Sequence, residues 1–347
     1  MWGAHLTHPK KTHKKIHLKH NKDTPPSKNI WQIIGENIRL PAYRHNYPVQ
    51  MQIRWLLAHP NSLLHRSQNA APYIYLVVSQ IKKMHLPIEL ALLPMIESNY
   101  DPQKTSQADA AGLWQLMPMT ARGLNLPMNP IYDGRRDILL STTAALQYLK
   151  YLHSHLHHSW ALALAAYNAG IGTVTRAIEY NLARGQSTNF WQLPLPQQTK
   201  AYLPKLIAIA IVLSHPERYK IPIKRIPNRP YLRQIVVPYP LCFDQLSYLT
   251  RVHKKHLLAL NPGYIRKKLP KQRHYRLLIP QYAWSTFKKN SAQQSHRSCR
   301  PIMVSTGDTL EAIAKRHAIS LAALMKRNHL TNSIIHPGQH LKIPYCK

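Results

Sequence analysis

Apolar residues recur at helical spacing through the first two thirds of the chain. Ile30, Trp31 and Ile34 begin this pattern, which predicts a helical segment over residues 29–75 that packs on the helices after it. From residue 76 to residue 217 the pattern stays helical, and its apolar runs are too short to span a bilayer. We therefore expect a mainly helical domain with an introductory helical segment in front of it.

Boundary signals divide the helical region further. Proline suits the first turn of a helix, hydroxyl side chains suit the N-cap, and glycine suits the position after the last turn. The predicted helices are one from Pro87 to about Glu97, one capped by Ser141 or Thr142, one over residues 160–168 that Ser159 caps and Gly170 ends in the left-handed conformation, and one over Tyr202–Leu213.

The pattern changes after Pro216, where prolines fall among β-branched residues and indicate a linker and short strands. Residues 243–280 then echo residues 308–344 at an offset of 64, so that Leu246 matches Leu310. This is an internal repeat. It predicts two small modules, at 221–282 and 301–345, joined by a flexible polar linker over 283–300.

Charge is the most unusual feature of the composition. The chain has 47 Lys and Arg against 13 Asp and Glu, a net charge of +34, which attracts anionic polymers. Residues 1–28 hold seven Lys and five His and have no apolar run, which predicts a disordered basic tail in which no export signal is visible. Cys242, Cys299 and Cys346 lie far apart and leave the redox compartment undecided.

Carboxylates are scarce enough for each one to be considered as a catalytic group. Only six Glu occur, and Glu97 follows the apolar run of residues 92–96. Partial burial at that helix end would raise the pKa of its carboxyl, and a rise of about two units corresponds to roughly 2.7 kcal/mol. A carboxyl that keeps its proton near neutral pH suits a general acid for glycosidic cleavage. The alternative role for Glu97 is a helix cap or a surface ion pair.

Three motifs follow one another in the helical region: Glu97-Ser98 with Ser106 after it, Gly-Leu-Trp-Gln-Leu-Met-Pro at residues 112–118, and Ala-Tyr-Asn-Ala-Gly at residues 166–170. Together they resemble the lytic transglycosylases of the lysozyme-like superfamily. Tyr-Asp-Gly-Arg-Arg-Asp at residues 132–137 extends the likeness to the membrane-bound lytic murein transglycosylase D type, which carries LysM repeats. Gln198 departs from that type, which usually has Glu before Thr199.

The resemblance is strong over residues 30–217 and 301–345 and weak over 221–282. It implies an α+β, mainly α fold, with a lysozyme-like helical catalytic domain over residues 76–217 followed by small βααβ LysM modules. It also implies cleavage of the β-1,4 bond between N-acetylmuramic acid and N-acetylglucosamine in peptidoglycan, with 1,6-anhydromuramic acid ends. The muramic acid 6-hydroxyl would be the nucleophile, so a single carboxylate suffices and no cofactor is expected.

Site residues are carried over from the family motifs. Glu97 would act first as acid and then as base, Ser106 and Gln115 would hold the N-acetyl region, and Tyr167 and Asn168 would line the subsites around the scissile bond. The full set of implied substrate-binding residues is Ser98, Ser106, Gln115, Tyr167, Asn168 and Tyr202.

The last segment resembles a LysM module, with Asp308 and Ser320 as expected N-caps of its two helices. The first copy of the repeat lacks the LysM signature and is predicted to be degenerate, and whether it binds glycan stays open. By family likeness, N-acetylglucosamine chains bind in a groove between residues 334–338 and the signature residues Gly307, Asp308, Thr309 and Leu310.

Other interpretations of the sequence stay open. A second carboxylate facing Glu97, either Asp101 or Asp109, would give a hydrolytic, lysozyme-type muramidase. The basic charge alone also fits a non-catalytic cell-wall or nucleic-acid binding protein, but no nucleic-acid recognition motif occurs, so we expect no specific nucleic acid. Histidines at residues 153–158 fit contacts with carbonyls at a helix end better than a metal site.

These expectations place the protein in the bacterial cell envelope, in the periplasm or at the membrane surface. We expect a monomer without a transmembrane span. Its expected partners are the glycan strands of peptidoglycan and other anionic envelope polymers.

Overall fold

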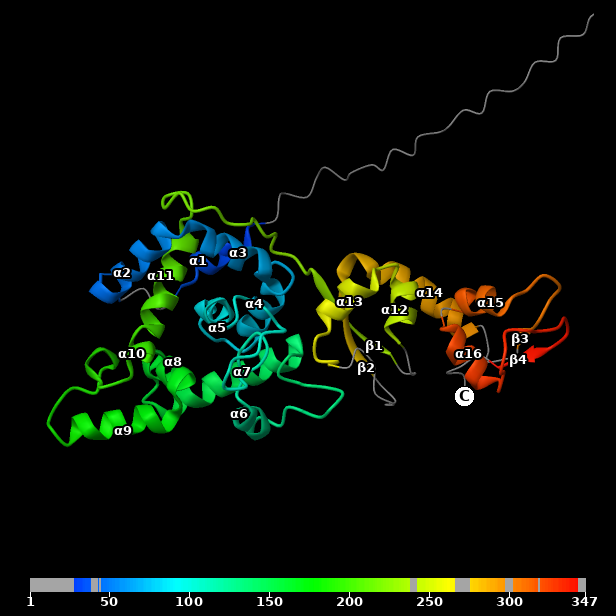
Figure 1. Ribbon diagram of the computed structural model, residues 1–347. Coiled ribbons are helices and arrows are strands. Elements are labelled where there is room, and N and C mark those ends of the chain that lie inside the picture. Colours follow the sequence, from blue (N-terminus) through cyan, green and yellow to red (C-terminus); the bar gives the residue numbers. More distant parts are fainter. Residues whose placement is uncertain are drawn as a thin grey trace, which may run out of the picture.

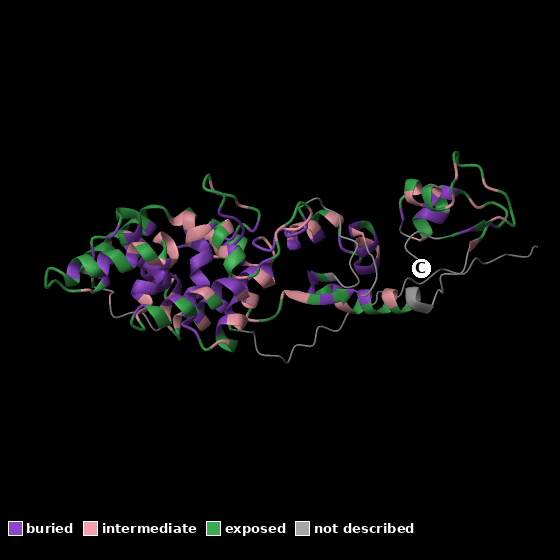
Figure 2. Ribbon diagram, turned by 90° about the horizontal axis from the view of Figure 1, so that it is seen from below, coloured by how far each residue is buried: buried purple, intermediate pink, exposed green. Residues whose placement is uncertain are grey.

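The computed structural model describes residues 28–38, 43, 45–237, 242–265, 275–296, 302–317 and 319–342. Within them the chain forms a large helical body and two small modules that each contain a two-stranded sheet (Figure 1). Buried residues are concentrated in the helical body (Figure 2). The α+β, mainly α fold class is confirmed. Residues 1–27 of the predicted tail, Cys299, Cys346 and the end of the last predicted strand lie outside the described residues.

The introductory segment packs against a late helix of the body. Its helices are α1 (Ile30–Gly35), α2 (Tyr47–Ala58) and α3 (Pro60–Ala70), and both α1 and α2 contact α11 (Tyr202–Ser214). Trp31 is fully buried, and its indole N–H donates to the carbonyl of Lys224 (2.9 Å). A Cβ on Gly35 would lie 2.8 Å from Ser214, so glycine permits the close approach of α1 and α11. The segment is thus part of the body's core.

The body is organised around α8 (Trp160–Ala169), whose residues 161–166 are all buried. Leucine and alanine on every side of this helix allow other helices to surround it. Its neighbours α7 (Ile138–His155), α9 (Ile171–Leu182) and α11 contact it directly. The remaining elements of the body are α4 (Ile74–Lys83), η2 (Ile88–Leu92), α5 (Leu93–Glu97), α6 (Pro118–Gly123), η3 (Phe190–Gln192) and α10 (Gln197–Lys200).

Predicted helix ends are partly confirmed. The segment after Pro87 ends at Glu97 as expected, but its first half is the 3-10 helix η2. Ser159 caps α8 through the N–H of Leu162. Gly170 ends α8 with a φ of 86°, yet its ψ of 144° is extended rather than left-handed helical, because the same residue also begins α9.

The predicted caps of α7 are wrong. Asp137 caps this helix, because its carboxylate accepts from the N–H groups of Leu139 (3.0 Å) and Leu140 (2.9 Å). Ser141 and Thr142 lie one turn inside the helix, where they are buried. Asp and Ser are comparable N-cap residues, so composition alone could not choose between them.

The first small module is a βααβ unit with an additional helix. Strands β1 (Leu232–Val237) and β2 (Tyr275–Pro280) pair antiparallel, with Ile235 opposite Leu277. Between them in the chain lie α12 (Phe243–Thr250) and α13 (Lys254–Leu260). Phe243 and Leu246 belong to an apolar core that is separate from the core of the body. The short η4 (Gln281–Ala283) leads into α14 (Trp284–His296).

The flexible linker predicted over 283–300 is wrong for residues 284–296, which form α14. Phe287 is only 7% exposed and belongs to the module core. The side-chain amide of Asn290 donates to the carbonyl of Leu249 at the end of α12 (2.9 Å). A few well-placed apolar and amide side chains therefore fix a segment whose overall composition is polar.

The C-terminal module repeats the βααβ order with β3 (Ile302–Met303), α15 (Leu310–Arg316), α16 (Leu321–Arg327) and β4 (His340–Leu341). Ser320 caps α16 as expected. Asp308 does not cap α15, because Thr309 accepts from the N–H of Ala312 (3.1 Å) instead. Asp308 accepts from the N–H of Ser305 and pairs with Arg316 (2.7 Å), which holds the pKa of its carboxyl below the usual value.

Among the described helices, none combines the length and apolar character needed to cross a membrane.

Burial of Trp31 predicts that the introductory segment contributes to the stability of the body. We expect Trp31→Ala to lower the free energy of unfolding by about 3–5 kcal/mol, since it leaves a cavity and an unsatisfied carbonyl at Lys224. Trp55→Ala on α2 is the matched control, since Trp55 is 44% exposed, and it should cost about 1 kcal/mol or less. Denaturant unfolding followed by circular dichroism measures both; equal effects of the two variants would contradict this packing.

Candidate active site

Glu97 is the last residue of α5, and its half-buried carboxyl meets the start of α11. The phenol hydroxyl of Tyr202 donates a hydrogen bond to Oε1 of Glu97. Burial raises the pKa of the Glu97 carboxyl to about 7, although the Tyr202 hydrogen bond and the charge of Lys104 act in the opposite direction. The carboxyl is therefore near half-protonated at neutral pH, as a general acid requires.

A tight turn after Glu97 sends the chain away from the carboxyl. Asn99 and Tyr100 both have positive φ angles, 54° and 60°. Tyr100 is buried, and its hydroxyl donates to the carbonyl of Ala91 (2.7 Å), which offsets the strain of the turn. Lys104 then reaches back, and its Nζ donates to the backbone carbonyl of Glu97 (2.9 Å).

Ser98 is not placed to contact substrate, contrary to the expectation from the family motif. Its side chain is 1% exposed, and its hydroxyl donates to the carbonyl of Leu113 (2.8 Å). This bond ties the end of α5 to the Gly-Leu-Trp-Gln segment. Ser98 therefore positions Glu97 rather than binding glycan.

The loop of residues 104–116 lies beside Glu97. The Gln115 side-chain amide donates to the carbonyls of Gly112 (2.9 Å) and Lys104 (3.3 Å). The Ser106 hydroxyl is half-buried and accepts from the N–H of Ala110 (3.0 Å). Gly112 has a φ of 82°, and a Cβ there would lie 2.0 Å from the carbonyl oxygen of Arg135. Only glycine allows the loop to pass this close to the segment after Asp133.

The Ala-Tyr-Asn-Ala-Gly motif forms the other side of the site, at the end of α8. The Tyr167 hydroxyl donates to the carbonyl of Trp114 (2.8 Å). Burial and the nearby charge of Glu97 raise the pKa of Tyr167. Asn168 accepts through Oδ1 from the Thr199 hydroxyl (2.9 Å), which connects α8 to α10. The structure thus brings Glu97, Tyr167 and Tyr202 together. Gln115 is connected to Glu97 through Lys104, and Asn168 follows Tyr167 near the end of α8.

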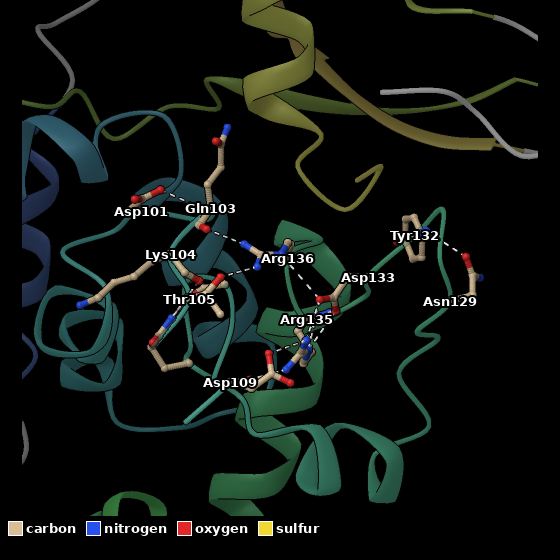
Figure 3. A network of polar contacts seen from close by, with 12 residues as sticks. Asp101, Gln103, Lys104, Thr105, Asp109, Asn129, Tyr132, Asp133, Arg135 and Arg136 are labelled. Carbon is tan, nitrogen blue, oxygen red and sulfur yellow. Dashed lines mark hydrogen bonds and ion pairs between the residues drawn. The ribbon is translucent and has the colours of Figure 1, made fainter. Parts of the chain in front are cut away.

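Sequence reasoning missed Lys104, Arg135 and Arg136 as residues that support the site. Arg135 Nη2 pairs with the buried carboxylate of Asp133 (2.9 Å), and its Nη1 donates to the Asp109 carbonyl (2.6 Å). Figure 3 shows both arginines between Asp133 and the loop that carries Lys104 and Thr105. The motif of residues 132–137 was the available signal, but a motif alone does not indicate which segment its guanidinium groups contact.

Asp101 and Asp109, the two candidates for a second catalytic carboxylate, contact groups other than Glu97. Asp101 is exposed and accepts from the N–H of Gln103 (2.8 Å), as a loop cap does. Asp109 is exposed and pairs with Arg135 at 3.6 Å. The charged neighbour that shifts the pKa of Glu97 is Lys104, and neither aspartate contributes to that shift. This geometry favours a site with a single catalytic carboxyl.

The LysM signature residues divide into exposed and buried ones. Gly307 and Thr309 are exposed, and Gly307 has a φ of 86° that suits the turn before α15. Leu310 is fully buried in the module core and does not line a groove with its side chain. The Leu310 side chain therefore occupies a core position, as the repeated apolar spacing of Leu310 and Ile313 indicates, and the glycan contact expected of this loop stays a prediction.

The histidines at the end of α7 make local contacts. His155 Nδ1 lies 2.9 Å from the carbonyl of Tyr151, and the ring of His153 stacks on Trp160 with 4.2 Å between centroids. Among the described residues, no group of three or more His, Cys, Asp or Glu side chains is arranged so that it could hold a metal ion.

Comparisons with known proteins give three family matches and a relative that spans most of the chain. Residues 77–190 match the transglycosylase SLT domain, residues 302–344 match the LysM domain, and residues 231–296 match the LysM-like domain of lytic transglycosylase MltD. The chain is 33% identical over 331 residues to membrane-bound lytic murein transglycosylase D of Escherichia coli (strain K12), covering 92% of this chain and 73% of that protein.

Two further similarities cover less of the chain. It is 37% identical over 166 residues to a putative tributyltin chloride resistance protein of Alteromonas sp. (strain M-1), covering 48% of this chain and 75% of that protein. The X-ray structure of the lytic transglycosylase Slt from Pseudomonas aeruginosa aligns with a TM-score of 0.34 and 24% identity, over 41% of this chain and 24% of that one.

The fold and the site define a lytic transglycosylase with LysM modules. The chain belongs to the membrane-bound lytic murein transglycosylase D family.

The raised pKa of Glu97 predicts how stability depends on pH. A carboxyl whose pKa rises from 4.5 to about 7 on folding favours the folded state in its neutral form. That stability is fully present below the unfolded pKa and is lost as pH rises through about 7. Glu97→Gln keeps the neutral form, so near pH 8 it should be more stable than the parent by about 3 kcal/mol.

Denaturant titrations near pH 4 and pH 8 measure this difference. The two proteins should be equally stable at the acidic pH. Exposed Glu179, changed to Gln, is the control and should not alter stability at either pH. A constant difference between Glu97→Gln and the parent across this range would contradict a raised pKa.

Proposed function

We propose that the protein cleaves the β-1,4 bond between N-acetylmuramic acid and N-acetylglucosamine in peptidoglycan by intramolecular transglycosylation, with Glu97 as the only catalytic carboxyl. The observation that carries this proposal is the half-buried Glu97 carboxyl, held by Tyr202 and with a pKa of about 7. Contacts of Asp101 and Asp109 with other groups support a mechanism without a second carboxylate.

In the first step the protonated Glu97 donates its proton to the glycosidic oxygen while the bond from that oxygen to C1 of muramic acid breaks. Tyr202 occupies Oε1, so we assign the donating proton to Oε2. In the second step the 6-hydroxyl of the same muramic acid attacks C1 and gives its proton to Glu97. One C–O bond breaks and one forms, Glu97 regains its proton, and no water is consumed.

Neighbouring groups stabilise the carboxylate that exists between the two steps. The Tyr202 hydrogen bond and the charge of Lys104 both favour the ionised form of Glu97. Without them burial would raise the pKa of the Glu97 carboxyl further. We assign Ser106, Gln115, Tyr167 and Asn168 to glycan binding. Ser106 and Gln115 belong to the loop that Lys104 joins to Glu97, and Tyr167 and Asn168 lie near the end of α8, where the charge of Glu97 acts on Tyr167.

The C-terminal LysM module would hold the enzyme on the wall. We assign glycan binding to Gly307, Asp308 and Thr309, together with residues 334–338. A net charge of +34 would add attraction to anionic envelope polymers and raise encounter rates. We propose a monomer that acts in the periplasm or at the membrane surface.

Glu97→Gln tests the assignment of the general acid. It should reduce the release of soluble muropeptides from purified peptidoglycan by at least about a thousandfold, because no other group supplies the proton. Mass spectrometry of the parent's products should show 1,6-anhydromuramic acid ends. Sedimentation with insoluble peptidoglycan should be unchanged for the variant, since the LysM module is intact. Reducing ends among the parent's products would instead establish hydrolysis, and full activity of Glu97→Gln would exclude this carboxyl.

Tyr202→Phe tests the hydrogen bond to Glu97. Because this bond lowers the pKa of the carboxyl, its removal should move the alkaline limb of the kcat/KM profile from about pH 7 upward by roughly one unit. Initial rates between acidic and alkaline pH measure the limb. Exposed Tyr180, changed to Phe, should leave it in place. An unmoved limb in Tyr202→Phe would show that the phenol does not act on this carboxyl.

A further inference from the structure

The LysM-like module formed by residues 231–296 is joined to the catalytic body by main-chain hydrogen bonds. The N–H of Asp133 donates to the carbonyl of Gly263 (2.8 Å), and the N–H of Ile265 donates to the carbonyl of Ile131 (3.0 Å). Between these two bonds the rings of Tyr132 and Tyr264 meet edge to face, 5.0 Å apart. Paired backbone bonds on both sides of an aromatic contact fix one orientation between the two segments.

Gly263 packs closely against the catalytic body at this junction. A Cβ on it would lie 3.0 Å from a ring carbon of Tyr132 and 3.4 Å from the carbonyl oxygen of Asp133. The Tyr132 hydroxyl in turn donates to Asp137, the N-cap of α7 (2.8 Å). A methyl group at Gly263 would therefore push on the segment of residues 131–137 rather than on solvent.

Two arginines connect this junction to the loop of residues 103–109, which we call the catalytic loop. The buried Asp133 carboxylate accepts from the Arg135 guanidinium and lies 3.6 Å from that of Arg136. Arg136 donates to the carbonyl of Gln103 and to the Thr105 hydroxyl (2.6 Å). In Figure 3 the two arginines lie between Asp133 and the loop of residues 103–109.

That loop contacts the main chain of Glu97. Lys104 donates to the backbone carbonyl of Glu97, and its own carbonyl accepts from the N–H of Gly112 (3.0 Å) and from the Gln115 side chain. Ser106 lies two residues further along. Movement of Gln103 and Thr105 would thus displace both the proton donor and the side chains assigned to glycan binding.

The C-terminal module shows which part of the LysM-like module makes the junction. Asn328 follows α16, and its side chain donates to Leu324 O and Lys342 O and accepts from Lys342 N. Asn261 follows α13 and makes the same three bonds, with Leu257 O, Leu278 O and Leu278 N. The two asparagines are therefore equivalent. Gly263 and Ile265 lie at the start of the loop between α13 and β2. The equivalent loop of the C-terminal module contains residues 334–338, which belong to the proposed glycan groove.

We propose that the LysM-like module is a brace for the active site: its loop of residues 261–265 fixes Asp133, and Asp133 with Arg135 and Arg136 holds the loop of residues 103–109 against Glu97. The surface that would bind glycan in a LysM module serves here to contact the catalytic body. Asp133, Arg135 and Arg136 are positioning residues. This inference rests on the proposed function, since it assigns a role in that reaction.

Gly263→Ala in the full chain tests the brace. We expect kcat for muropeptide release from soluble glycan strands to fall about tenfold, with KM within about twofold, because the proton donor is displaced while wall binding is not. Sedimentation with insoluble peptidoglycan should be unchanged. Gly123→Ala is the matched control, since a Cβ there meets nothing within 4 Å, and it should retain the parent's kcat.

Arg136→Met separates positioning from folding of the module. It removes both hydrogen bonds to the catalytic loop and leaves the module junction intact, so it should reproduce the loss of kcat even if Gly263→Ala fails to fold. The double variant should be no slower than the slower single variant, because both changes interrupt one connection.

Several results would overturn the brace. One is a parent-like kcat in either single variant, and another is a loss of kcat in the double variant that equals the product of the two single losses. A third is a rise in KM together with weaker sedimentation, which would indicate a glycan-binding module. Failure of the proposed function is distinguishable, because the parent itself would then release no products with 1,6-anhydro ends.

Discussion

The carboxyl of Glu97 must be desolvated enough to keep a proton near neutral pH and still stabilised enough to release it. Burial among the residues of α5, α8 and α11 supplies the first condition, and the Tyr202 hydroxyl with the Lys104 charge supplies the second. Both conditions depend on helices that are distant in sequence meeting at one point. Much of the body can be understood as the packing that holds these helix ends together.

That packing extends beyond the catalytic motifs. The introductory helices α1 and α2 lie against α11, which begins at Tyr202, so residues far from the site determine where the phenol lies. The bonds of Ser98 and Lys104 hold the end of α5. The half-buried carboxyl thus depends on both helix positions, that of α5 and that of α11.

Local patterns in the sequence predicted the mainly helical body, the repeated βααβ order, and Glu97, Gln115, Tyr167 and Tyr202 as site residues. The structure confirms the helical body and the βααβ order, because helix periodicity is a local property, whereas the roles of the four site residues stay predictions. The hydrogen bond between Glu97 and Tyr202 joins residues 105 positions apart, and no local pattern indicates such a pair. The same limit explains why Arg135 and Arg136 were not assigned: their partners lie about thirty residues earlier in the chain.

Two motif residues have side chains that the structure places in the interior. Ser98 and Leu310 belong to family motifs, and a motif does not separate side chains that face a ligand from those that support the turn. Ser98 turns inward to Leu113, and Leu310 completes the core of the C-terminal module. Burial is decided by the three-dimensional packing of several segments, so it could be read only from the structure.

Helix α14 changes how far the C-terminal module can range from the catalytic body. A flexible chain over residues 283–300 would have a root-mean-square span of roughly 25 Å with a broad spread, whereas the 13 helical residues of α14 form a stiff spacer about 20 Å long. A stiff spacer narrows the range of separations between the wall-bound module and the catalytic body and raises the effective concentration of glycan strands near the enzyme. Successive cleavages would then cluster around each attachment point.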